Sequence, residues 1–198
     1  MKEKSPIEEA VKLISKMPGF GEKSASRLVY WLLGPGRKTL PELKSVLEEL
    51  AAKVKACSLC GNYSLTDPCE ICSDQTRDVS TLMVVADGKD VTAIEKTQSH
   101  HGRYFLLGGL LSPRLGIGPE QLRTSELLKR LASEPVKEVI IALSSSQEGE
   151  TTSHWLVQQM AGIEVRITRL ARGLPVATSI EYLDPESLKL AIEGRKEF

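Results

Sequence analysis

The chain has 198 residues, of which 41% are hydrophobic and 26% are charged, and these fractions exclude a wholly disordered protein. Lys plus Arg and Asp plus Glu both number 26, so the formal net charge is zero and any attraction for nucleic acid must come from local basic clusters. No apolar run approaches the ~20 residues of a membrane span, and the first residues lack the hydrophobic segment of a secretory signal. We therefore expect a cytoplasmic protein without membrane contact.

The first predicted unit, within residues 5 to 56, consists of two helices joined by a tight turn. Ser5-Pro6-Ile7-Glu8 has the pattern of a capping box with proline at the first helical position. This helix ends at Met17-Pro18-Gly19-Phe20-Gly21, and a second helix runs from about Ser24 until Gly34-Pro35-Gly36 breaks it. The arrangement is typical of a helix-hairpin-helix.

The turn of this hairpin has the features of a contact with the DNA backbone. Its glycines allow close approach to a phosphate, and the amides at the start of the second helix are free to donate. From residue 12 to residue 38 the chain has six basic residues and one acid, Glu22. We predict sequence-independent DNA contacts at Lys16, Gly19, Gly21, Lys23 and Arg27. The alternative is that the hairpin only packs against another subunit and that its basic residues form a solvated face.

A third helix is predicted from about Pro41 to Ala56, and it leads directly into a cysteine cluster. Its apolar residues recur at helical spacing, so they are expected to form a buried stripe. The residues of this stripe are Leu43, Val46, Leu47, Leu50 and Val54.

The four cysteines form two pairs, Cys57-Ser58-Leu59-Cys60 and Cys69-Glu70-Ile71-Cys72, with eight residues between them. Two such pairs can place four thiolates at the corners of a tetrahedron around a metal, with Zn–S distances of ~2.3 Å. Because four sulfurs leave no open position for water, the spacing predicts one structural Zn²⁺ per chain. Two disulfides or an iron–sulfur centre are the alternatives, and a reducing compartment favours the metal over disulfides.

After the cysteines, short apolar strands alternate with helices. Strands are predicted at Leu82–Ala86, Tyr104–Leu107, Val139–Leu143 and Val165–Leu170, and helices near 90–98, 120–132 and 150–161. This alternation predicts a mostly parallel sheet with helices on its faces. A loop rich in glycine and proline spans Gly108–Pro119, and the tail is expected to hold a strand at Ile180–Leu183 and a terminal helix.

The run Ser144-Ser145-Ser146-Gln147-Glu148-Gly149-Glu150 follows the third predicted strand, where such sheets place their sites. It is similar to the acidic motif of the Toprim fold of topoisomerases and primases, in which two aspartates flanking one residue, followed by Glu-Gly-Glu, help to hold magnesium. Both aspartate positions are serine here, Ser144 and Ser146, and the glutamate that ends the first Toprim strand falls at Ala86.

Magnesium requires carboxylate ligands, so we expect no catalytic residues at this edge of the sheet. A weak metal site built from Asp87, Asp90 and Glu148 is one alternative reading of these acids. Glu148 and Glu150 instead suggest an acidic surface for a protein partner, and a solvated helix start is the simplest alternative.

The order of these parts resembles the RecR family of bacterial recombination mediators over essentially the whole chain. The resemblance rests on Pro-Gly-Phe-Gly-Glu-Lys-Ser-Ala-Ser-Arg-Leu from Pro18, the four cysteines, Gly102-Arg103-Tyr104-Phe105 and the tail motif Ala171–Val176. We expect a multidomain α + α/β protein with a helix-hairpin-helix domain (1–55), a four-cysteine zinc ribbon (56–78), a Toprim-like, mostly parallel α/β domain (79–172) and a short C-terminal tail (173–198). The segment Ile180–Asp184 of that tail is similar to a Walker B strand, but no Walker A motif accompanies it, so ATP hydrolysis is not expected.

The resemblance implies a DNA-binding mediator without enzymatic activity that acts with RecO, and in some bacteria with RecF, to load RecA on single-stranded DNA. Members of the family form ring-like tetramers able to surround DNA, so we expect a homo-oligomer, a tetramer or dimer, associated with the nucleoid. By motif, Lys23 and Arg27 would contact DNA, and Glu148 and Glu150 would contact the partner. Two other classes remain open: a magnesium-dependent Toprim nuclease or topoisomerase, and a protein adaptor that reaches DNA only through partners.

Overall fold

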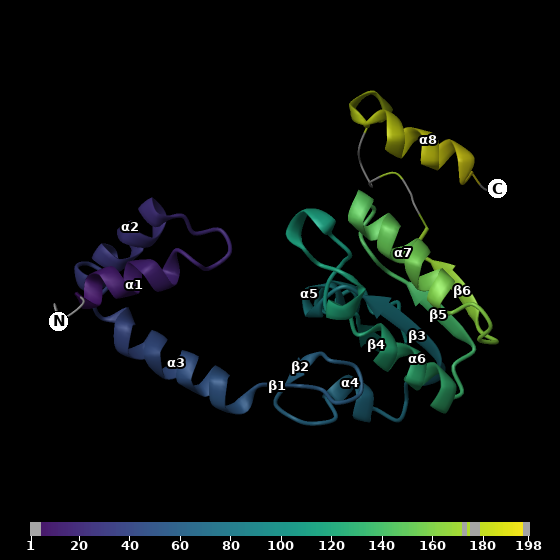
Figure 1. The fold of residues 1–198 in the computed structure, drawn as a ribbon, viewed down its shortest axis with the longest axis horizontal. Coiled ribbons are helices and arrows are strands. Elements are labelled where there is room, and N and C mark those ends of the chain that lie inside the picture. Colours follow the sequence, from purple (N-terminus) through teal and green to yellow (C-terminus); the bar gives the residue numbers. More distant parts are fainter. Residues whose placement is uncertain (1–4, 172–173, 175–178, 196–198) are drawn as a thin grey trace. The chain divides into compact units, whose positions relative to one another are not determined.

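The computed structural model describes residues 5–171, 174 and 179–195, and Figure 1 shows the arrangement of its elements. The chain divides into two compact units, Met1–Val54 and Lys55–Phe198, which we describe separately. Across the described ranges, none of the helices combines the length and the apolar character that crossing a bilayer requires.

The N-terminal unit contains α1 (Pro6–Ile14), α2 (Glu22–Leu33) and α3 (Thr39–Lys53). The helices α1 and α2 pack against each other as a hairpin (Figure 1), as the sequence predicts. The predicted capping box is wrong, because the side chain of Ser5 makes no capping hydrogen bond. The proline at the first helical position fixes the helical φ angle and removes one amide donor, which starts α1 without that cap.

The buried stripe predicted on α3 is wrong, because none of the residues of this helix is buried. Leu43, Val46, Leu47 and Leu50 are 40%, 56%, 52% and 55% exposed. The helical spacing of apolar residues does indicate an apolar face that is normally buried. The spacing does not identify the surface against which that face packs. The helix also ends at Lys53 and not at Ala56, because Lys55–Ala56 forms a strand.

The second unit begins with the zinc module, residues 55–74. It contains β1 (Lys55–Ala56), β2 (Tyr63–Ser64) and the short helix α4 (Glu70–Ser73). The two strands pair in antiparallel register, Lys55 opposite Ser64 and Ala56 opposite Tyr63. The first cysteine pair follows β1 directly, and the second lies at the start of α4.

A four-stranded sheet follows, in the order β4-β3-β5-β6, and all three strand pairings are parallel, as predicted. Its strands are β3 (Asp78–Val85), β4 (Gly102–Leu106), β5 (Glu138–Ile141) and β6 (Arg166–Arg169). The intervening helices are α5 (Gly88–Glu95), α6 (Thr124–Ser133) and α7 (Gln147–Gln159). The first strand starts four residues before the predicted Leu82, and the third ends two residues before the predicted Leu143.

Alternate residues of the strands face two separate cores, because successive side chains of a strand point to opposite faces. Leu82 and Val84 of β3 pack with α6 and α7 on one face of the sheet. Met83 and Val85 pack on the other face with Val91 of α5. The sheet is therefore covered by helices on both sides, and the carboxyl ends of its strands are left open for the loops that follow them.

In the C-terminal tail, the strand predicted at Ile180–Leu183 is wrong, since Ile180–Tyr182 forms a 3₁₀ turn. A short apolar run fits either conformation, and here it leads into α8 (Pro185–Glu193), which begins with Asp184 as its N-cap. The helix α8 confirms the predicted terminal helix. Most of the motif from 171 to 176 lies outside the described residues.

Candidate zinc centre and nucleic-acid interface

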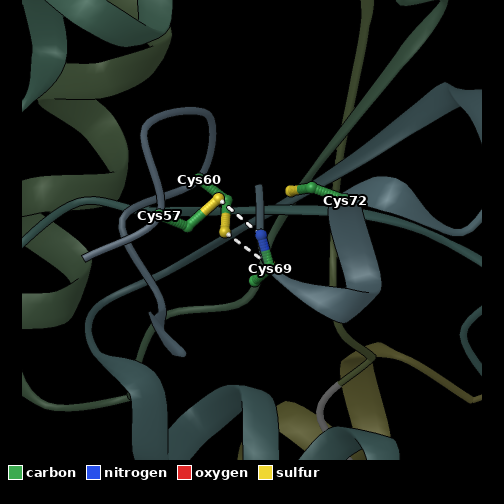
Figure 2. A group of neighbouring side chains, drawn as sticks. All are labelled: Cys57, Cys60, Cys69 and Cys72. Carbon is green, nitrogen blue, oxygen red and sulfur yellow. Dashed lines mark hydrogen bonds between the residues drawn. The ribbon is translucent and has the colours of Figure 1, made fainter. Parts of the chain in front are cut away.

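The four cysteines lie together at the centre of the zinc module (Figure 2). Their sulfur atoms all lie within 4.8 Å of one another, and each side chain is between 1% and 4% exposed. The Sγ atoms of Cys60 and Cys69 are 3.6 Å apart, close to the ~3.8 Å that separates two ligands of a tetrahedral zinc with 2.3 Å bonds. A disulfide requires ~2.05 Å, and all four thiols are free.

Local hydrogen bonds shape the loop that carries the first cysteine pair. The Cys57 amide donates to Asn62 O at 2.8 Å, and the Gly61 amide donates to Cys57 O at 2.8 Å. Gly61 has a φ of 84°, which favours glycine. Asp67 accepts hydrogen bonds from both the amide and the hydroxyl of Ser58 at 2.8 Å. These contacts turn Cys57 and Cys60 toward the second pair.

The electrostatics of the cluster fit a cation. Hydrogen bonding, chiefly from Cys72, lowers the pKa of the Cys60 thiol to about 5, which favours one thiolate. Burial raises the pKa of Cys69 to about 11, and the hydrogen bond with Cys60 raises the pKa of Cys72. Four buried sulfurs can therefore all ionise only beside a positive charge, and thiolate donors at this spacing suit zinc.

Two arginines of the α6 region join the zinc module to the sheet, and sequence reasoning missed them. Arg123 donates from Nη1 to Cys60 O at 3.0 Å and to Leu106 O at 3.2 Å, and its guanidinium lies 4.9 Å from the Phe105 ring centroid. The Leu106 amide donates to the same Cys60 oxygen at 2.8 Å. A side chain at Gly61 would collide with Arg123, since its Cβ would lie 1.7 Å from Nη1.

Arg130 makes the second link, two turns further along α6. It donates from Nη1 to Tyr104 O at 3.0 Å and to Leu59 O at 3.3 Å, and from Nε to Glu134 Oε1 at 3.0 Å. Its side chain is only 6% exposed. Sequence alone offers no signal for these arginines, because the backbone carbonyls that accept from them lie 17 to 71 residues away along the chain.

The predicted DNA-contacting residues all lie exposed on the α1–α2 hairpin: Lys16, Gly19, Gly21, Lys23 and Arg27. Gly19 has a φ of 83°, which explains the glycine at that position. Gly21 is extended, and a Cβ there would meet nothing within 4 Å, so the folded chain gives no reason for this glycine. Within the described chain, no acceptor meets the amides of residues 22 to 24, the first three of α2.

Ser144 and Ser146, at the carboxyl end of the sheet, lie where α7 begins. The hydroxyls of Ser144 and Ser146 lie 2.9 Å apart, and Ser146 accepts a hydrogen bond from the Gly149 amide at 3.2 Å as the N-cap of α7. A Cβ at Gly149 would lie 2.0 Å from the Ser144 carbonyl oxygen. Glycine is thus required where α7 packs closely on the end of β5.

The acids near this edge are engaged in local contacts. Asp87 accepts from the Lys89 amide at 2.7 Å, and Asp90 accepts from the amides of residues 86 and 87 at 3.1 Å each, which caps α5. Glu148 lies 3.8 Å from Arg114, and Glu150 lies 3.4 Å from Arg169. Among the described residues, only the cysteines form a group able to share a metal, so the weak site of Asp87, Asp90 and Glu148 is not assembled.

Comparisons with known proteins agree with this geometry. Residues 80–171 match the family model of the Toprim domain, and residues 54–74 match that of the four-cysteine zinc finger domain of RecR. The recombination protein RecR of Mesorhizobium japonicum is 42% identical over 192 residues, 97% of this chain and 96% of the relative. That of Acidothermus cellulolyticus is 44% identical over 191 residues, 96% of each chain. The four clustered cysteines are therefore a structural zinc site.

Proposed function

Because the chain belongs to the RecR family of recombination proteins, we propose that it is a DNA-binding recombination mediator in DNA repair and that it performs no chemistry on the strand. It would act with RecO, and with RecF where that protein is present, in loading RecA on single-stranded DNA, as a ring-shaped clamp in the bacterial cytoplasm and nucleoid. The observation that carries the proposal is the exposed hairpin, which combines free amides, an open glycine and basic side chains.

The hairpin suits a phosphate and not a base. Three amide donors at the start of α2 and the positive end of the helix dipole favour an anion. Lys23 and Arg27 lie one turn apart on the same helix, so both side chains can face one strand. The space around Gly21 would admit the close approach of a sugar–phosphate backbone. Contacts of this kind carry no sequence information.

The absence of strand chemistry is proposed from the sheet edge. Ser144 and Ser146 offer neutral hydroxyls where a Toprim enzyme has carboxylates, and Ala86 offers no ligand. Asp87 and Asp90 are already used as helix caps. A nicking assay with magnesium or manganese tests this part: we expect intact DNA, whereas cleavage that is lost in Asp87→Asn would establish an enzyme.

Self-association is proposed from the exposed apolar stripe of α3. An uncovered row of four leucine and valine side chains is unusual on a monomer and typical of an interface. A tetramer or dimer would multiply weak backbone contacts, so a chain with no net charge can still hold DNA firmly. Measurement of molar mass in solution, with and without DNA, tests this state.

Glu148 and Glu150 are proposed as the surface for the partner RecO. Both begin α7 at the open edge of the sheet, and each lies near an arginine of its own chain. A basic partner would compete with these arginines for the carboxylates.

The decisive experiment is DNA binding by the double variant Lys23→Ala/Arg27→Ala over a range of salt concentrations. For single strands the logarithmic salt slope is about −0.7 per phosphate contact, so loss of both contacts should reduce it by about 1.4 for each subunit engaged. The control is Lys44→Ala/Lys53→Ala, which removes two exposed cations from α3 of the same unit. Equal DNA affinity and equal salt slope in both double variants would refute the assignment of the hairpin as the DNA-binding site.

A further inference from the structure

A hollow of about 460 Å³ lies where the zinc module meets the carboxyl ends of β3 and β4. The zinc module contributes Gly61 and Tyr63 to its lining, the segments after the two strands contribute residues 86–88 and Gly108, and α6 contributes Glu126. The volume lies within the ~300 to 1,000 Å³ that is usual for small-molecule sites. A ligand of the size of a nucleobase can therefore enter it.

The walls of this hollow are held together by hydrogen bonds and by the zinc site. Arg123, which also lines the hollow, donates from Nη1 to Cys60 O of the zinc module at 3.0 Å and to Leu106 O of β4 at 3.2 Å. Tyr63 pairs with Ala56 in the short sheet of the zinc module. Because the walls are fixed before a ligand arrives, little ordering entropy is lost when it binds.

Tyr63 is the aromatic residue of the lining. Its side chain is 72% exposed, and in the described part of the chain no other ring and no guanidinium stacks on it. Exposed aromatic rings on a rigid support are the stacking platforms of proteins that bind single-stranded nucleic acid, because every base has a π-face. The position of Tyr63 suits such a role.

Glu126 supplies a hydrogen-bond acceptor to the same hollow. Its Oε2 accepts from Nε and Nη2 of Arg123, at 3.1 and 2.5 Å, whereas no donor within the described residues meets Oε1. The hydrogen bonds from Arg123 lower the pKa of the Glu126 carboxyl, so this group is ionised at neutral pH. Asp87 lines the hollow as well. Two carboxylates disfavour a phosphate in the hollow but accept readily from the N–H groups of a neutral base.

We propose that this hollow binds one unstacked base of single-stranded DNA. The base would stack on the ring of Tyr63 and donate from its Watson–Crick edge to Glu126, while its sugar and phosphate stay outside. The exposed Lys89, which follows the lining residue Gly88, would offer a cation to that phosphate. All four bases have an N–H donor on this edge, so the site tolerates any sequence, but a base paired in a duplex cannot enter. The inference rests on the DNA binding proposed above and adds a preference for single strands.

The test measures the affinity of the full-length, zinc-loaded chain for oligo(dT), for a strand of the same length with abasic sites, and for duplex DNA. Tyr63→Ala should weaken oligo(dT) binding about 5- to 10-fold through the loss of one stacked base. The same variant should bind the abasic strand and the duplex as the wild type does. Tyr63→Phe should keep full affinity, because stacking needs the ring and not the hydroxyl.

Two further variants complete the set. The matched control is Tyr182→Ala, a tyrosine 79% exposed in the C-terminal tail, which should leave all three affinities unchanged. Glu126→Ala should weaken binding of oligo(dT) but not of the abasic strand. Tyr63→Trp provides a direct signal, since oligo(dT) should quench the fluorescence that this variant has in addition to that of the wild type.

The outcomes separate this inference from the proposal on which it rests. If the wild-type chain binds none of the three DNAs, the proposed DNA binding fails and the base site fails with it. If the wild type binds DNA but Tyr63→Ala binds oligo(dT) equally well, DNA binding stands and only the base site is refuted. An equal loss on all three DNAs would assign Tyr63 to the folding of the zinc module and also refute it. Quenching of Tyr63→Trp by thymidine monophosphate at the concentration at which oligo(dT) acts would assign the hollow to a free nucleotide and overturn the inference.

Discussion

Replacement of Arg130 by methionine tests whether α6 holds the zinc module by buried hydrogen bonds. Methionine keeps most of the apolar stem and removes the guanidinium. The two carbonyl contacts, with Tyr104 O at 3.0 Å and Leu59 O at 3.3 Å, are each worth about 1.5–3 kcal/mol because the donor is charged. The longer bond favours the lower end, and the Glu134 carboxylate, whose Oε2 is buried, loses its cation, so we expect a loss of about 3 kcal/mol in all.

Urea unfolding gives the measurement. With a slope of about 2 kcal/mol per molar urea, a loss of about 3 kcal/mol lowers the midpoint by about 1.5 M. Trp155 packs against the core of the sheet unit, so its fluorescence in a Trp31→Phe background reports on that unit alone. The control is Arg166→Met, which removes an ion pair with Glu138 from a side chain that is 72% exposed and should cost less than about 1 kcal/mol. Equal midpoints for the two variants would refute the reasoning.

Three further predictions concern glycines, zinc and pH. Gly149→Ala should destabilise the chain by about 1–3 kcal/mol because its Cβ would meet Ser144 O, whereas Gly21→Ala should leave the melting temperature unchanged and weaken DNA binding. Chelation of zinc should lower the melting temperature of the sheet unit, with metal content and near-ultraviolet dichroism as the measurements. Hydrogen bonds from Arg77 and Tyr104 lower the pKa of Glu95 below its ordinary 4.5; its stabilisation is therefore complete above pH 4.5 and is lost as the pH falls through the lowered pKa. Glu95→Gln should accordingly lose less urea stability than the wild type between neutral pH and about pH 3.

The strand and cysteine predictions succeeded where the physical signal is local. Apolar runs such as Leu82–Val85 are buried on both faces of a parallel sheet, so they differ sharply from the helices around them. The cysteine spacing likewise carries the geometry of a tetrahedral site within 16 residues.

Predictions failed where a residue's environment depends on contacts that are distant in the sequence or that another chain would supply. The spacing of α3 indicates an apolar face but cannot say that this face stays exposed in the single chain. Arg123 and Arg130 contact carbonyls 63 and 71 residues away, at Cys60 and Leu59, and no pattern near α6 marks them. The run Ile180–Tyr182 is too short for its apolar residues to distinguish a strand from a 3₁₀ turn.

If the exposed aliphatic row on α3 is the self-association surface proposed above, protein concentration becomes a variable of folding. Only two hydrophobic residues of the N-terminal unit, Ala25 and Val29, are buried within the described chain, so one copy alone has little apolar burial to offset the entropy of ordering three helices. When another copy covers that row, mass action adds stability that grows with the amount of protein present. Dilution would then destabilise the hairpin that carries Lys23 and Arg27. The concentration of the protein in the cell would set the fraction of chains that are able to bind DNA.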